Sequence, residues 1–96
     1  MRNIVEFRII YDRDSDVLYI TTPYRAAERG IEDDSGLVWR YDGRGHLLGC
    51  TILDFAGHWY PERGGQLATR LARNLELPLV QVENVLAHVS DTENNA

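Results

Sequence analysis

Three side chains in the middle of the chain are of the types that perform nucleophilic catalysis: Cys50, Asp54 and His58. They offer a thiol, a carboxylate and an imidazole at intervals of four residues, a spacing that would align them on a helix. Residues 46–54, however, have the composition of a strand, in which Cys50 shares a face with Ile52. A reactive thiolate needs a partly exposed, electropositive setting, and the neighbouring residues supply none. We therefore predict that Cys50 is a core residue, that no catalytic site forms and that the protein is not an enzyme.

Asp12, Asp14 and Asp16 have the D-x-D-x-D spacing that opens a calcium-binding loop. Such a loop needs glycine at its sixth position and a bidentate glutamate at its twelfth, where this chain has Val17 and Pro23. Aspartate also favours tight turns, because its side chain bonds to its own backbone. We expect these residues to shape a hairpin turn and to bind no metal.

The segment His58-Trp59-Tyr60 is the strongest candidate for a contact with another protein. Tryptophan and tyrosine are enriched among the residues that dominate binding energies at interfaces. The same aromatic side chains could instead fill the space between the sheet and the helices. Both interpretations are open at this point.

Residues 66–89 resemble a helix-turn-helix, in which the second helix would enter the major groove of DNA. Gln81 and Asn84 would then be the base-contacting residues. Two features depart from the motif: Glu76 stands where the turn usually has glycine, and the second helix offers no lysine or arginine for phosphates. A plain helical hairpin packed on a sheet explains the same apolar spacing.

The composition bounds these alternatives. The 96 residues include ten arginines, no lysine and fifteen carboxylates, for a net charge of −5, which argues against nucleic acid as the main partner. One cysteine cannot form an internal disulfide and suggests a reducing compartment. The longest apolar run, 17–20, is far too short to span a membrane. We expect a cytoplasmic protein.

The elements that must position these residues are first strands and then helices. Apolar and charged residues alternate over residues 5–11, and β-branched and aromatic residues return over 17–22. Further strands are predicted over 26–31, 37–41 and 46–54, the last two joined by an Asp-Gly turn. Because this glycine-rich turn leads into a strand and not into a helix, it is no phosphate-binding loop, and we expect no cofactor.

After residue 54 the pattern changes. Residues 55–65 are predicted to form a loop, 66–90 two helices and 91–96 a disordered polar tail. The first helix carries Leu67, Leu71 and Leu75 on one face. The prediction is a single α+β domain over 1–96: an antiparallel β-meander of four to five strands over 1–54, followed by a C-terminal helical hairpin.

Both faces of this sheet carry apolar residues. Ile10, Val17, Tyr19 and Val38 have the opposite parity from their neighbours on the same strands. Two short helices can cover only one face of a sheet. We therefore predict a homodimer.

The strand segments share a spaced pattern with a known family. The pattern comprises Tyr11-Asp12-x-x-x-Asp16-Val17-Leu18-Tyr19-Ile20, an acidic turn ending in Gly36, and Tyr41-Asp42-x-x-Gly45-x-Leu47-x-Gly49-x-x-Ile52-Leu53-Asp54. It resembles the domain-of-unknown-function family 2283 of small bacterial proteins over about residues 9–56. The resemblance implies a compact β-rich domain without an established activity. Such domains are sometimes suggested as partners in toxin–antitoxin-like gene pairs. Cys50 and the C-terminal helices depart from the family pattern.

The leading functional hypothesis is a non-catalytic protein–protein interaction module, an antitoxin-like partner in the sense of that resemblance. The alternatives are a DNA-binding regulator that uses residues 66–89, and a small ligand-binding domain or enzyme with polar groups around Asp54 and His58.

Overall fold

The computed structural model describes residues 7–22 and 26–94, with 90–94 described by their backbone alone. Pro23, the expected end of the second strand, lies outside the described residues, as do residues 5 and 6 of the first predicted strand and residues 95–96 of the predicted tail.

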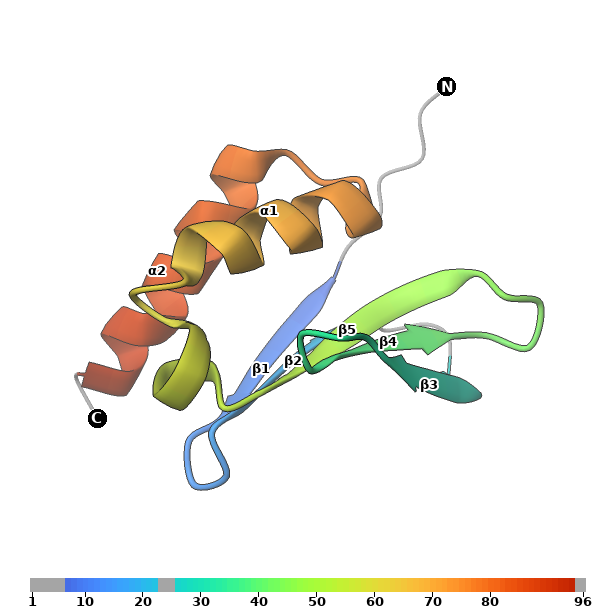
Figure 1. Cartoon of the computed structure of the whole chain (residues 1–96), viewed down its shortest axis with the longest axis horizontal. Coiled ribbons are helices and arrows are strands. Elements are labelled where there is room, and N and C mark those ends of the chain that lie inside the picture. Colours follow the sequence, from blue (N-terminus) through green and yellow to red (C-terminus); the bar gives the residue numbers. More distant parts are fainter. Residues whose placement is uncertain (1–6, 23–25, 95–96) are drawn as a thin grey trace.

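Five strands form one antiparallel sheet, and two helices follow it (Figure 1). The strands are β1 (Arg8–Asp12), β2 (Val17–Thr21), β3 (Arg29–Glu32), β4 (Leu37–Tyr41) and β5 (Leu47–Leu53). A π-helical turn, η1 (Phe55–Trp59), leads to α1 (Gly64–Leu75) and α2 (Leu79–Asn94). The predicted α+β class, with the sheet first and the helical pair last, is confirmed.

The strand order, which the sequence pattern left open, is β1-β2-β5-β4-β3. The last strand in the chain, β5, therefore lies at the centre and pairs with both β2 and β4. Cys50 on β5 stands between Ile20 on β2 and Trp39 on β4, and its side chain is fully buried. The two edges of the sheet are β1 and β3.

Gly49 allows β2 and β5 to approach closely. A Cβ atom at this position would collide with the carbonyl oxygen of Ile20. The neighbouring pair of strands shows a register shift at Arg40/Tyr41, beside the partner of Gly49. Only glycine fits this approach without displacing the β2 backbone, which gives a physical reason for glycine at this point of the strand pattern.

The first helix buries the stripe that its spacing predicted: Leu67, Ala68, Leu71, Ala72 and Leu75. It ends at Glu76, whose φ of 57° is left-handed. The N–H of Leu77 donates to the carbonyl of Ala72 at 3.0 Å, the bond of a Schellman motif. Glutamate thus takes the position that glycine usually holds, with no change in the form of the turn.

Three boundaries differ from the predictions. The predicted loop over 55–65 contains η1, because the N–H of Tyr60 reaches back to the carbonyl of Phe55. The first helix begins at Gly64, two residues early, and α2 extends to Asn94, which includes most of the predicted tail. Five residues of η1 carry too little periodicity for such a turn to be read from sequence.

Both helices lie on one face of the sheet (Figure 1), where α1 packs against β5 and α2 packs against α1. The core lies between the two layers. Its members come from three strands (β2, β4 and β5), η1 and both helices; the largest fully buried side chains are Phe55, Leu18, Leu37, Ile52, Leu67, Leu71 and Leu86. In the described residues, no helix is long and apolar enough to cross a membrane.

The opposite face of the sheet carries a row of side chains in register: Ile10, Tyr19, Thr51 and Val38. Thr51 at the centre is buried, whereas Ile10 on the edge strand is 48% exposed. The homodimer that was predicted from this apolar face stays a prediction, and the row shows that its most exposed member is at the β1 edge.

Candidate functional site

Asp16 joins the first hairpin to η1. Its carboxylate accepts hydrogen bonds from the Tyr11 hydroxyl at 2.6 Å and from the N–H groups of Ala56 and Gly57 at 2.8 and 2.9 Å. Burial raises the pKa of Asp16, but these three donors outweigh it and lower the pKa below its ordinary value. Among the described residues, no group of three or more His, Cys, Asp or Glu side chains could hold a metal ion. Within the D-x-D-x-D turn, the Asp12 carboxylate accepts the N–H of Ser15, and Asp16 accepts the first two N–H groups of η1 after Phe55.

Asp33 is the hydrogen-bond acceptor that holds the β3–β4 turn together. Its carboxylate accepts bonds from the indole N–H of Trp39 at 2.9 Å, the hydroxyl and N–H of Ser35, and the N–H of Leu37. Burial raises its pKa, but the hydrogen bonds from Trp39, Ser35 and Leu37 outweigh this effect and lower the pKa to about 2. Arg70 on α1 lies 3.6 Å away and connects this turn to the helical layer.

Asp42 closes the β4–β5 turn. Its carboxylate accepts bonds from the N–H groups of Arg44 and His46, both at 2.9 Å, and lies 3.0 Å from Nδ1 of His46. The His46 N–H does most to lower its pKa; burial opposes this, and the His46 ring and the Arg44 N–H assist it, so that the pKa is about 2. All these partners belong to one turn, so the arrangement accounts for turn geometry and needs no reaction to explain it.

The Cys50, Asp54 and His58 side chains do not form a nucleophilic site. Burial, and then the charge of Asp33, raise the pKa of the Cys50 thiol to about 12. Asp54 has a left-handed φ of 55° and begins η1, and His58 is exposed on that turn. A protonated thiol with no exposed surface is reached by neither a base nor a substrate.

The aromatic segment His58-Trp59-Tyr60 divides between the two interpretations that the sequence left open. Trp59 is 4% exposed and belongs to the core, where it fills the space between sheet and helices. Tyr60 is half-buried and stacks on Phe55 with 5.5 Å between the ring centroids. Only His58 of the three presents an exposed side chain. Whether it contacts a partner stays a prediction.

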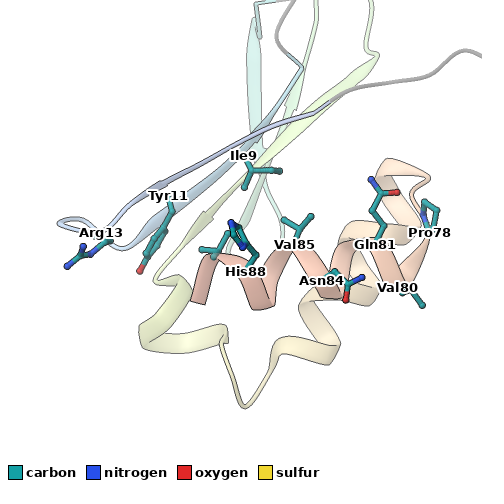
Figure 2. A pocket seen from close by; sticks show the side chains of 10 residues that line it. Ile9, Tyr11, Arg13, Pro78, Val80, Gln81, Asn84, Val85 and His88 are labelled. Carbon is teal, nitrogen blue, oxygen red and sulfur yellow. The ribbon is translucent and has the colours of Figure 1, made fainter. Parts of the chain in front are cut away.

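Gln81 and Asn84, the predicted DNA contacts, both line the groove between α2 and β1 (Figure 2). Both are exposed, but they line a groove whose opposite wall is a strand. In a helix-turn-helix, the residues that read bases lie on a helix face that can enter the major groove.

A groove with a volume of about 830 Å³ lies between β1 and α2. Figure 2 shows Ile9 and Tyr11 directed from β1 toward α2. The groove is lined by Ile9, Tyr11, Arg13, Pro78, Val80, Gln81, Asn84, Val85, His88 and Val89. Six of these ten side chains are apolar or aromatic, and the other four, Arg13, Gln81, Asn84 and His88, are polar. The arrangement can bind an apolar partner surface with polar groups at its rim.

The sequence patterns missed this groove, although two signals pointed to it. Ile9 and Ile10 place apolar side chains on both faces of an edge strand. Leu79 and Val80 precede the apolar stripe of α2 and are 42% and 66% exposed. Such exposure at the end of an otherwise regular helix indicates a surface that another group can cover.

Comparison with known proteins adds a family. The family model described as "Protein of unknown function (DUF2283)" matches residues 8–55, which is half of the 96-residue chain. The match includes all five strands and ends on the first residue of η1, so α1 and α2 lie outside it. No curated protein and no solved structure gives a significant match. Since the match covers half of the chain, the chain belongs to the family of proteins of unknown function DUF2283.

Proposed function

We propose that this domain is a non-catalytic protein–protein interaction module and that the β1–α2 groove is its binding surface. The observation that carries the proposal is the groove itself: about 830 Å³, lined mainly by apolar side chains, between an edge strand and a helix. Pockets of this kind accept an apolar anchor, and an edge strand of the sheet, such as β1 among the described strands, can add backbone hydrogen bonds beside it.

The exposed side chains support this assignment. Val80 on the groove is 66% exposed and Ile10 on the adjoining strand is 48% exposed. Single exposed apolar residues are ordinary, but these lie on the two elements that form one groove. An interface in the groove would remove Val80 from water, and one that extended over the β1 edge would also cover Ile10 on the outer face.

The groups that could support catalysis have other roles. The Cys50 thiol is buried with its pKa raised to about 12, and the Asp16 and Asp33 carboxylates each accept several hydrogen bonds within turns. These observations favour a binding role over an enzymatic one. They also reduce the support for a ligand site around Asp54 and His58.

The partner that we propose is another protein, and the family resemblance makes an antitoxin-like role with a neighbouring gene product the first case to examine. A tagged copy with the full sequence is used to recover proteins from nuclease-treated lysate of the native host. The same experiment is done with Val80→Glu, which places a charge in the groove, and with Thr69→Glu, which places one on the exposed face of α1.

A stoichiometric protein that is retained by Thr69→Glu and lost with Val80→Glu would support the proposal. Equal recovery with both variants would place the binding surface elsewhere. Recovery of the bait alone, at native concentrations, would contradict a heterologous partner.

A further inference from the structure

The sequence of β1 is self-complementary. It reads Arg8-Ile9-Ile10-Tyr11-Asp12, with a basic residue at one end, an acidic residue at the other and apolar residues between them. In an antiparallel pair of two such strands centred on Ile10, the Arg8 of each copy lies opposite the Asp12 of the other. The same register places Ile10 opposite Ile10 and Ile9 opposite Tyr11.

We propose that the β1–α2 surface binds a second copy of this chain, by antiparallel pairing of β1 with β1 centred on Ile10. This inference rests on the proposed function, in which the same surface is the binding site, and it names the occupant. It joins two five-stranded sheets into one continuous sheet of ten strands.

The outer face of the sheet supports this register. Ile10 stands opposite Tyr19 within one copy, and Tyr19 stands opposite Thr51. Residues that lie opposite one another in a sheet project to the same face, so pairing on Ile10 continues this row into the second copy. The 48% exposed side chain of Ile10 would then be covered by its equivalent.

The charges at the strand ends are in position for this pairing. Arg8 and Asp12 are exposed, and they share the outer face with Ile10, as the alternating burial of the strand shows. The Asp12 carboxylate accepts a long bond of 3.4 Å from the N–H of Ser15. A parallel pair, or an antiparallel pair shifted by two residues, would lose the two opposite-charge contacts that this register provides.

The groove on the helix-facing side of the sheet also supports pairing of β1 with a second β1. Ile9 and Tyr11 project toward α2, and among the described strands none lies beyond β1 (Figure 2). A second β1 would supply that missing strand and would bring its own Ile9 and Tyr11 beside the groove. By the two-fold symmetry the two grooves become one cavity with a helix α2 on each side, so that each copy completes the site of the other.

A pair of cysteine variants tests the register directly. Ile10 and Ile31 are nearly equally exposed, at 48% and 50%, and lie on opposite edges of the sheet. Opposite residues in an antiparallel pair have Cβ atoms about 5 Å apart, close enough for a disulfide after small adjustment. The buried Cys50 stays in place in both variants, since its thiol is inaccessible.

The expected result is that Ile10→Cys forms a disulfide-linked dimer under mild oxidation and that Ile31→Cys does not. The unmodified chain is expected to sediment as a dimer at the same concentration. A monomer at high micromolar concentration would overturn the inference. Equal cross-linking of the two variants, or a dimer in which Ile10→Cys fails to cross-link, would overturn the β1 register.

A charge exchange provides the second test. Arg8→Asp and Asp12→Arg each place like charges opposite one another at two symmetry-related points, and each is expected to weaken dimerisation by roughly tenfold at low salt. The double variant restores opposite charges and is expected to return the affinity to near that of the unmodified chain. A double variant as weak as the sum of the two singles would contradict the pairing.

These outcomes separate the inference from the proposed function. A monomeric chain that still loses a heterologous partner on Val80→Glu retains the interaction surface and rejects the second copy as its occupant. A β1-paired dimer with no heterologous partner establishes self-association as the only binding at this surface. A monomer without any groove-dependent partner rejects both.

Discussion

The two edges of the sheet differ in what lies beside them. β1 has five residues with an apolar centre, and α2 forms a groove with it. β3 has four residues, all exposed, with charged residues at both ends and Gly30 next to Arg29. Its Arg29 guanidinium lies 5.8 Å from the centre of the Tyr41 ring. Short, charged edge strands resist pairing with other chains, whereas an apolar edge invites it. The difference teaches that one sheet can have an apolar edge and a short, charged edge in the same domain.

The largest effect that we expect comes from breaking the β1 edge alone. Ile10→Lys would place two ammonium groups opposite one another across the proposed pair and remove apolar burial, which should weaken dimerisation by at least about 100-fold. Ile31→Lys, at a matched exposure of 50%, should leave the sedimentation coefficient unchanged. Sedimentation velocity over a concentration series measures both. Loss of the dimer with Ile31→Lys would place the interface at the β3 edge and contradict pairing through β1.

The turns beside the two edges offer a sharper comparison of stability. Asp33→Ala removes the acceptor for the indole of Trp39, which is 7% exposed, and should lower the free energy of unfolding by about 2 kcal/mol. Asp16→Ala leaves the N–H groups of Ala56 and Gly57 on an exposed turn, where water can replace the carboxylate. Its expected cost is about 1 kcal/mol.

Urea denaturation at neutral pH measures both values. Thr69→Ala, an exposed change on α1, serves as a baseline for a substitution without a buried partner. A larger loss for Asp16→Ala than for Asp33→Ala would show that the β1 turn, and not the β3 turn, carries more of the stability.

Acid should act through the same carboxylates. The pKa of Asp33 and that of Asp42 are both about 2, below the ordinary value of 3.8. A lowered pKa in the folded state contributes stability that is present above the unfolded value and is lost as the pH falls toward the folded one. Stability should therefore decline between about pH 4 and pH 2, with Asp33 contributing on the order of 2 kcal/mol.

Thermal unfolding across this range measures the decline. In Asp33→Ala the slope below pH 4 should be shallower than in the unmodified chain, because one of the linked groups is gone. An unchanged slope would assign the acid sensitivity to other carboxylates.

The smallest effect concerns DNA. Because Gln81 and Asn84 line the groove and the chain carries a charge of −5, a titration with duplex DNA at low salt should show no binding above background. Fluorescence anisotropy with a labelled duplex is sufficient. Binding that falls steeply with salt and is lost on Asn84→Ala would restore the DNA-binding alternative.

Much of the fold could be predicted from local patterns. The alternation before Asp12, the apolar run after Asp16 and the Asp-Gly turn each specify a strand or hairpin through nearest-neighbour chemistry. Leu67, Leu71 and Leu75 specify a helix in the same way. The confirmed elements are those whose signals lie within a few residues of one another.

The strand order and the groove depend on contacts between distant residues. β5 pairs with β2 across an interval of about thirty residues, and no local pattern selects that partner over β3. The groove needs Ile9 and Val85 on facing elements, although each has an ordinary neighbourhood in its own segment. Candidate residues chosen by type, such as Cys50 and Trp59, were buried because the sheet and the helices close over them.

The burial of Cys50 gives the molecule a built-in reporter of its own opening. It is the only cysteine in the sequence, it lies at the middle of the central strand, and its thiol has no exposed surface. A thiol reagent can modify it only in molecules whose β5 has separated from its neighbours. When reclosing is faster than modification, the rate of labelling measures the equilibrium population of that open state. The unmodified chain therefore carries the probe needed to follow its own conformational stability, in dilute solution or in a cell extract.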